Sequence, residues 1–137
     1  MKMNPEYAIE HFVKTFIRKS RRERLLFELT RKERRYDGVS RFCHQAEELL
    51  EPSRIVLEGK DMDRRPEFLR FIQQHDEVCL LLSPDPSLHG LSLSMADAVQ
   101  QAESCPDAVL ILGRTFAVVY TEPVKGGRDT YLLSEKE

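Results

Sequence analysis

The chain has 137 residues, of which 41% are hydrophobic and 32% are charged, and its formal net charge is −2 at pH 7. This length and balance are those of one globular domain, 1–137, and they exclude a disordered chain. No stretch approaches the roughly 18 apolar residues of a membrane span, the first residues lack the apolar run of a secretion signal, and the three cysteines show no paired spacing, so we expect a soluble cytoplasmic protein.

Two helices are predicted in the first 30 residues. Asn4 and Pro5 form a helix start, because an Asn side chain caps free backbone N–H groups and proline suits the first helical position. Apolar side chains within 9–17 then recur at steps of three and four residues, as on one face of a helix. The segment Ser20–Glu23 has the spacing of a capping box, which predicts that a second helix begins there.

A third helix is predicted between Ser40 and Pro52. The dipeptide Asp37-Gly38 is typical of a turn, and Ser40 is placed to cap the helix that comes after it. Apolar residues then keep helical spacing until Pro52 ends the pattern. Residues 1–51 are therefore expected to form a helical part.

The pattern changes at residue 54 to one that favours a sheet. The β-branched run Ile55–Gly59 predicts a strand, and Pro66 opens an amphipathic helix. The run Val78–Leu82 is apolar at every position, which is typical of a strand covered on both faces. Another helix is expected to begin after Ser94, which can cap it.

Three further strands are predicted in the C-terminal third. Asp107–Leu112 and Thr115–Thr121 flank a short turn and should pair as a hairpin, and Asp129–Leu133 follows a pair of glycines. The order of elements predicts an α+β (mixed α/β) fold, with three N-terminal helices and a sheet part over 54–134. We expect a mixed sheet of about five strands, with parallel neighbours joined by two crossover helices and a C-terminal antiparallel meander.

A polar loop, Ser83–Ser94, is the best candidate for a small-ligand or hydrolase-type site. Ligands of sheets with helical crossovers tend to bind beyond the carboxyl ends of strands. Asp85, His89 and Ser92 supply a carboxylate, an imidazole and a hydroxyl, the groups that act as orienter, base and nucleophile. Arg114 is expected near them. These three residues are the catalytic candidates.

Basic residues are the candidates for contacts with an anionic partner. Ten Lys and Arg residues lie between residues 14 and 35 on two predicted helices, which favours phosphate contacts. Acidic residues interleave with them and the pI is about 6.1, which favours solvated helix faces instead. A glycine turn near residue 126 carries two more cations. The predicted binding residues are Arg18, Arg21, Arg22, Arg34, Arg35, Lys125 and Arg128.

No cofactor or metal is expected from the sequence. The histidines are scattered, the one adjacent Cys-His pair would point in different directions on a helix, and no pair of ligands has the spacing of a zinc site. The phosphate-binding glycine motifs of nucleotide sites are also lacking.

The interpretation that fits best is a small, cytoplasmic, non-enzymatic domain that binds another protein. Residues 1–42 carry 12 basic and 6 acidic residues, whereas the rest of the chain carries 9 and 17. Opposed charge fields can steer a partner, as in a regulatory or toxin-neutralising protein, or join two copies as a homodimer. Nucleic-acid binding through the basic helices is the alternative, and a small-ligand or hydrolase-type site in the loop is the second alternative.

Overall fold

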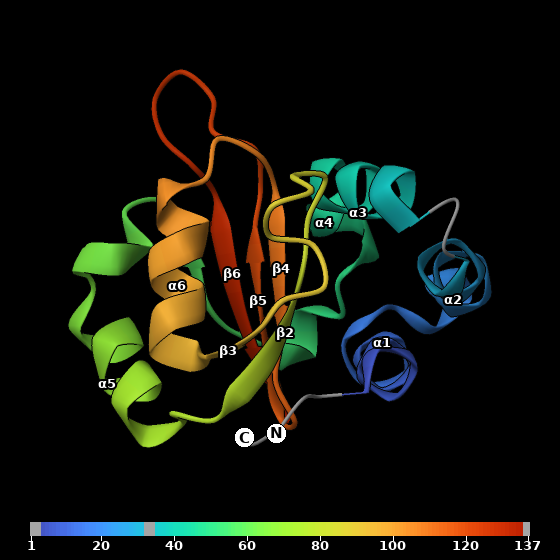
Figure 1. The fold of residues 1–137 in the computed structure, drawn as a ribbon, viewed down its shortest axis with the longest axis horizontal. Helices are drawn as coiled ribbons and strands as arrows, with labels where there is room; N and C mark the ends of the chain where they lie inside the picture. The colour runs from blue at the N-terminus through green and yellow to red at the C-terminus, as the bar shows by residue number, and fades with distance from the viewer. Residues whose placement is uncertain (1–3, 32–34, 136–137) are drawn as a thin grey trace.

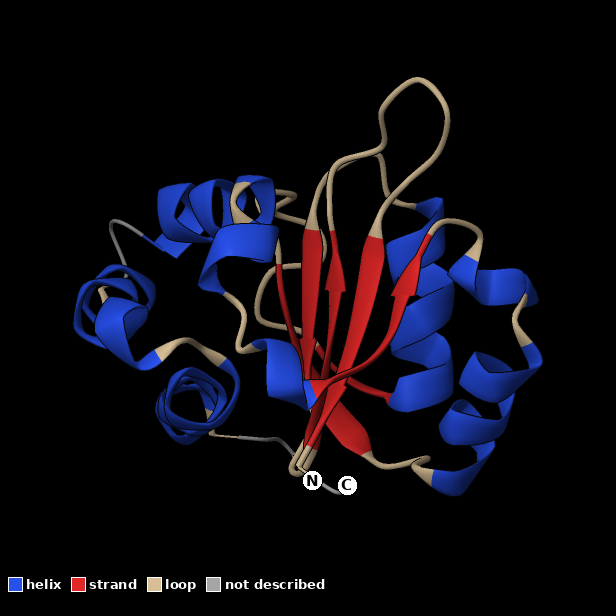
Figure 2. Ribbon diagram, turned by 180° about the vertical axis from the view of Figure 1, so that it is seen from behind, coloured by secondary structure: helices blue, strands red, loops and turns tan. Residues whose placement is uncertain are grey.

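The chain forms a sheet with helices on both sides (Figures 1 and 2). The structure is a computed structural model that describes residues 4–31 and 35–135. The helices are α1 (Pro5–Phe16), α2 (Arg22–Thr30), α3 (Arg35–His44), α4 (Ala46–Leu49), α5 (Pro66–Gln74) and α6 (Met95–Ser104), and the 3-10 turns are η1 (Lys19–Arg21), η3 (Pro52–Arg54) and η4 (Met62–Arg64). The strands are β1 (Ile55–Gly59), β2 (Val78–Leu82), β3 (Ser92–Ser94), β4 (Val109–Leu112), β5 (Phe116–Tyr120) and β6 (Thr130–Ser134).

The predicted fold class, α+β with the helices first and the sheet after them, is confirmed. Helices α1 to α4 cover one face of the sheet and α5 and α6 cover the other, so that the sheet is the middle of three layers (Figure 1). None of the described helices is long and apolar enough to cross a membrane.

The side chains of the central strands β2, β4 and β5 alternate between two hydrophobic cores, one on each face of the sheet. In β2, Leu80 and Leu82 pack against the helices of the N-terminal part, whereas Cys79 and Leu81 face α5 and α6. The same alternation holds along β4 and β5, whose residues are all buried. The prediction that Val78–Leu82 is covered on both faces is therefore confirmed for residues 79–82, since a strand between two helical layers has no solvated side, whereas Val78 at the start of the strand is exposed.

The expected parallel pairing is wrong, because every strand pair of the described sheet is antiparallel. The six strands are ordered β1-β6-β5-β4-β2-β3. The sequence pattern missed β3, three residues long, which reverses the chain beside β2 before α6 begins. Helix α6 then returns the chain, so β4 enters on the other side of β2 and runs antiparallel to it.

Two local predictions for the third helix are also wrong. Asp37-Gly38 does not turn the chain but lies inside α3, and Ser40 lies inside the same helix instead of capping it. A Cβ atom at Gly38 would stand 3.2 Å from the Cβ of Glu28 and 3.3 Å from Cδ2 of Leu29. The glycine is therefore used for close packing of α3 on α2, not for a turn.

The predicted helix caps at Asn4 and Ser94 are confirmed, whereas the one at Ser20 is wrong. Asn4 caps α1 as predicted, accepting from the backbone N–H groups of Glu6 and Tyr7, and Ser94 caps α6 through the N–H of Asp97. Ser20 does not cap α2, because it lies within η1 and the helix begins after Arg21 without a side-chain cap.

Replacing Phe12 tests whether α1 belongs to the core. The ring is buried and meets Phe42 edge-on at a centroid distance of 5.6 Å. Phe12→Ala should lower the free energy of unfolding by about 3 to 5 kcal/mol, measured by urea denaturation. The matched control is Phe27→Ala on α2, whose ring is 47% exposed and whose loss should cost less than about 1 kcal/mol. Equal costs for the two variants would show that α1 does not dock as described.

A methyl group at Gly113 tests the packing of the β4–β5 hairpin. An ideal Cβ there would lie 2.6 Å from Cε2 of Phe116, whose ring packs edge-on against Phe71. Gly113→Ala should therefore cost about 1 to 3 kcal/mol of stability, measured by thermal denaturation. In a Phe116→Leu background the same change should cost clearly less, because the clashing ring atoms are gone. An undiminished cost in that background would contradict the steric explanation.

Candidate functional site

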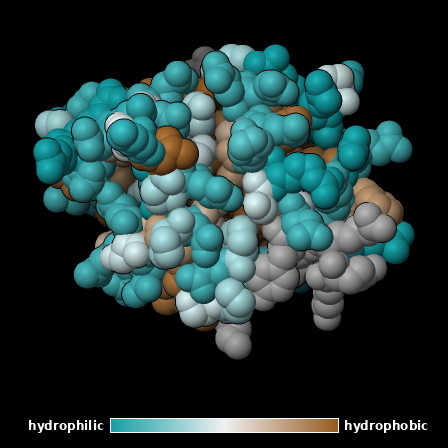
Figure 3. Space-filling view, turned by 90° about the horizontal axis from the view of Figure 1, so that it is seen from above, coloured by the Kyte–Doolittle hydropathy of each residue, from teal (hydrophilic) through white to brown (hydrophobic). Residues whose placement is uncertain are grey.

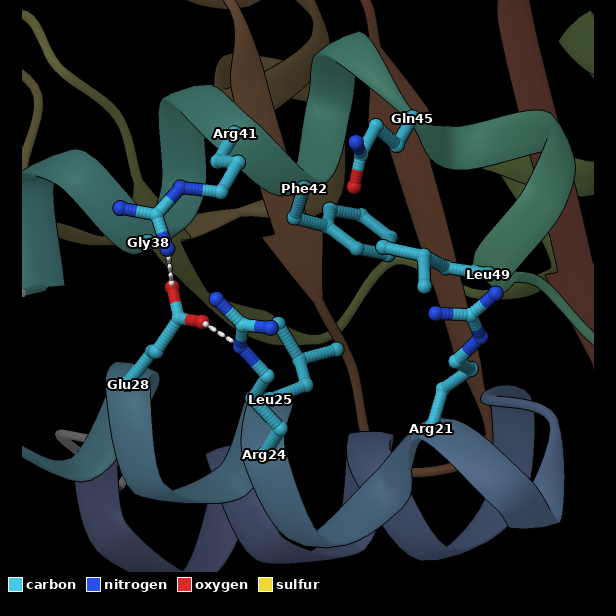
Figure 4. A pocket seen from close by; sticks show the side chains of 9 residues that line it. All are labelled: Arg21, Arg24, Leu25, Glu28, Gly38, Arg41, Phe42, Gln45 and Leu49. Atoms are coloured by element: carbon cyan, nitrogen blue, oxygen red, sulfur yellow. Dashed lines mark hydrogen bonds and ion pairs between the residues drawn. The ribbon is translucent and has the colours of Figure 1, made fainter.

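A surface groove lies between α2 on one side and α3 with α4 on the other. It has a volume of about 180 Å³ and combines arginines with an apolar floor (Figure 4). The residues that line it are Arg21, Arg24, Leu25, Glu28, Gly38, Arg41, Phe42, Gln45 and Leu49. We refer to these nine residues as the arginine groove.

The floor of the arginine groove is apolar because it is the outer margin of the N-terminal core. Leu25 of α2, Phe42 of α3 and Leu49 of α4 are buried members of that core. Each lies on the inward stripe of its helix, and three helices meet there. A ligand in the groove would therefore find hydrophobic surface below it.

Glu28 organises the cations along the rim. Its side chain is 11% exposed, and its carboxylate accepts from Nε of Arg24 at 3.2 Å and from Nη1 of Arg41 at 2.7 Å (Figure 4). Two cationic partners offset the cost of burying one carboxylate. The Arg24 and Arg41 side chains stay 83% and 50% exposed, so both can also face an incoming anion.

Arg21 completes the positive rim. Its side chain makes no hydrogen bond among the described residues, and it reaches toward Leu49 across the groove (Figure 4). Arg21 also lines a neighbouring hollow with Arg18 and Glu47. Three arginines against one carboxylate leave the groove with an excess of two positive charges.

The structure uses two of the predicted binding residues to join segments of the fold. Arg18 donates from Nε to the carbonyl of Leu50 at 2.9 Å and from Nη2 to that of Glu47 at 3.3 Å. Arg22 donates from Nε to the carbonyl of Ile17 at 2.9 Å. These guanidinium groups hold backbone carbonyls near the ends of helices, so only part of their donor capacity is available to a partner.

Arg128 has the same structural use on the other side of the molecule. Its guanidinium donates to the carbonyls of Thr121 at 2.6 Å, of Ala102 at 2.7 Å and of Asp107, and it lies over the ring of Tyr120. It thereby ties the loop between β5 and β6 to α6.

Three predicted binding residues remain: Lys125, Arg34 and Arg35. Lys125 is exposed in the loop between β5 and β6. Arg34 lies outside the described residues, and so does the side chain of Arg35, the first residue of α3. Of the seven predicted binding residues, the described structure places only Arg21 in the groove.

Sequence reasoning counted Arg24 among the basic residues between 14 and 35 but did not select it, and it missed Glu28 and Arg41 as site residues. The spacing of Arg24 and Glu28 was an available signal, since residues four apart on a helix are neighbours. Arg41 gave no local signal, because it reaches Glu28 from another helix 13 residues away.

Two of the three catalytic candidates, Asp85 and His89, make hydrogen bonds within the Ser83–Ser94 loop. The Asp85 carboxylate accepts two hydrogen bonds from Ser87, one from the hydroxyl at 2.7 Å and one from the backbone N–H at 2.9 Å. These hydrogen bonds lower the pKa of Asp85. His89 Nδ1 accepts from the backbone N–H of Ser83 at 3.2 Å, and Ser92 lies in β3 opposite Leu80.

Arg114, expected near those candidates, follows β4 at the start of the β4–β5 turn. Its backbone N–H donates to a carboxylate oxygen of Glu77 at 3.0 Å. The residue is exposed, and this hydrogen bond is made by its main chain and not by its guanidinium group.

Among the described residues, one group of side chains has the spacing to hold a metal ion. Ligand atoms of Asp85, Cys105 and Asp107 lie within 4.8 Å of one another. The Cys105 Sγ already donates to Asp85 at 3.6 Å and accepts from the Asp107 N–H at 3.4 Å, and burial raises the pKa of this thiol. Because a metal needs the thiolate, these internal contacts explain the cluster without an ion.

The chain matches no protein-family model, no curated protein and no solved structure. The chemistry of the arginine groove therefore carries the functional proposal.

Removing the Glu28 carboxylate tests its role in holding the rim. Glu28→Gln should lower the free energy of unfolding by about 1 to 2 kcal/mol, since the two hydrogen bonds to the exposed arginines lose the charge of their acceptor. The control is Glu23→Gln, an exposed position of the same helix, which should change stability by less than about 0.5 kcal/mol. Urea denaturation of both variants measures the difference, and equal stabilities would contradict the assigned role.

Proposed function

We propose that this protein is a small, cytoplasmic, non-enzymatic binding protein whose arginine groove takes an acidic, amphipathic segment of a partner protein. The observation that carries the proposal is the combination of three rim arginines with an apolar floor in one cavity. Carboxylates of the partner would meet Arg21, Arg24 and Arg41. Its apolar side chains would cover Leu25, Phe42 and Leu49, in the manner of a helix laid in a groove.

The outer face of α2 extends this surface. Phe27 is exposed, and the guanidinium carbon of Arg31 lies 4.4 Å from the centre of its ring. Arg24 and Phe27 are three residues apart on α2, and Arg31, which follows the end of the helix, lies over the Phe27 ring, so the three side chains form a strip beside the groove. Arginine and aromatic residues are enriched in the parts of interfaces that contribute most to binding.

A protein partner suits the groove better than nucleic acid does. Phosphate backbones are bound by cations spread over a wide face, whereas here the cations surround an apolar floor and a buried carboxylate. The face seen from above is largely hydrophilic, with small separate hydrophobic groups instead of one broad patch (Figure 3). A polar rim around a small apolar centre is typical of protein interfaces.

The test is a fluorescence-anisotropy titration with a labelled synthetic helical peptide that alternates glutamate and leucine faces. The peptide should bind saturably, and Arg24→Glu and Arg21→Glu should each weaken binding at least about tenfold, as expected for a lost and reversed charge contact. The control Lys125→Glu makes the same charge change outside the groove and should bind as the wild type does.

Two further probes decide between partner classes. A single-stranded DNA oligonucleotide of matched charge should bind more weakly than the peptide, and a polyglutamate peptide without leucine should do the same. Tighter binding of the DNA, with affinity falling steeply as salt is added, would overturn the proposal in favour of nucleic acid. A dimer in light scattering that dissociates in Arg24→Glu would identify the partner as a second copy of this chain.

A further inference from the structure

A second cavity, of about 170 Å³, lies on the face of the sheet opposite the arginine groove. It is formed where η4, α6 and the adjoining ends of β5 and β6 meet. The residues that line it are Asp61, Met62, Asp63, Glu103, Tyr120, Arg128 and Thr130. We refer to it as the tyrosine cavity.

Tyr120 supplies the polar group that needs a partner. The residue is 1% exposed, and its hydroxyl is buried without a hydrogen bond among the described residues. Burial raises the pKa of this phenol, so the hydroxyl stays protonated at neutral pH and can both donate and accept. A buried hydroxyl without a partner costs free energy that a ligand in the cavity would recover.

The cavity carries an excess of negative charge. Asp61, Asp63 and Glu103 contribute three carboxyl groups, and Arg128 is the one cation among the lining residues. Each nitrogen of the Arg128 guanidinium already donates to a backbone carbonyl, as described above. Burial, and then the charge of Asp63, raise the pKa of Glu103 to about 7, while Arg128 lowers it.

A single metal ion does not fit this arrangement. Among the described residues, the three carboxyl groups of the tyrosine cavity do not form a cluster with the spacing of metal ligands, as the side chains of Asp85, Cys105 and Asp107 do. The charges instead surround a space large enough for several atoms. A molecule with N–H donors on a flexible chain matches carboxylates that lie apart.

We propose that the tyrosine cavity binds a small organic diamine, whose two ammonium groups donate to Glu103, to Asp63 and to the hydroxyl oxygen of Tyr120. The cations neutralise carboxylates that otherwise repel each other, and the phenol gains its missing partner. This site is independent of the arginine groove, because the two lie on opposite faces of the sheet.

The experiment is an NMR titration of the full chain with putrescine, with sodium butyrate as the anionic comparison. Putrescine should shift amide signals around η4 and the end of α6, and butyrate should not. Glu103→Gln and Asp63→Asn should each weaken putrescine binding about tenfold, and Tyr120→Phe should weaken it severalfold, while Glu122→Gln, an exposed carboxylate outside the cavity, should bind normally.

A pH series separates binding from a merely structural effect. Glu103 loses its proton near pH 7, so putrescine affinity should rise between pH 6 and pH 8 in the wild type and stay level in Glu103→Gln. Asp61, Asp63, Tyr120 and Arg128 face the same cavity. The absence of saturable shifts, equal shifts with butyrate, or wild-type affinity in both Glu103→Gln and Asp63→Asn would overturn the proposal.

Discussion

A sheet whose two faces are both apolar is the constraint on which the rest of this molecule depends. Side chains of β4 and β5 are buried on both sides, so each face must be covered by helices or the sheet would expose hydrophobic surface to water. The N-terminal helices cover one face, and α5 with α6 cover the other (Figure 2). The basic N-terminal part is therefore a layer of the core and not an arm attached to it.

Covering the sheet with several short helices creates junctions, and the candidate sites lie at these junctions. The arginine groove lies where α2 meets α3 and α4, and the tyrosine cavity lies where η4 and α6 meet the sheet. In both places the core residues form the floor and charged residues form the rim. Apolar packing decides where the hollows are, while the charged side chains decide what could enter them.

The arginines of this protein divide according to their hydrogen-bond partners. Arg18, Arg22 and Arg128 donate to backbone carbonyls and join segments that are distant in sequence or at helix ends. Arg24 and Arg41 are held by the Glu28 carboxylate and remain exposed, and this is why they are the better candidates for binding. The sequence alone does not distinguish an arginine that joins segments of the fold from one that is free to bind a partner. The difference is set by which acceptor it reaches once the chain has folded.

The sequence by itself determined the elements with strong local signals. The cap at Asn4, the helix begun at Pro66 and the apolar run Val78–Leu82 follow from periodicity and backbone chemistry within a few residues. With the order of helices and strands, these signals were sufficient for the fold class.

Only the tertiary structure decided the pairing of strands, the use of Gly38 and the composition of the arginine groove. β3 is too short to give a pattern, yet it reverses the chain and makes the sheet antiparallel. Gly38 has turn chemistry in sequence but allows two helices to touch. Arg41 meets Glu28 only because α3 packs on α2. Contacts of this kind depend on distances between segments, which local residue patterns do not encode.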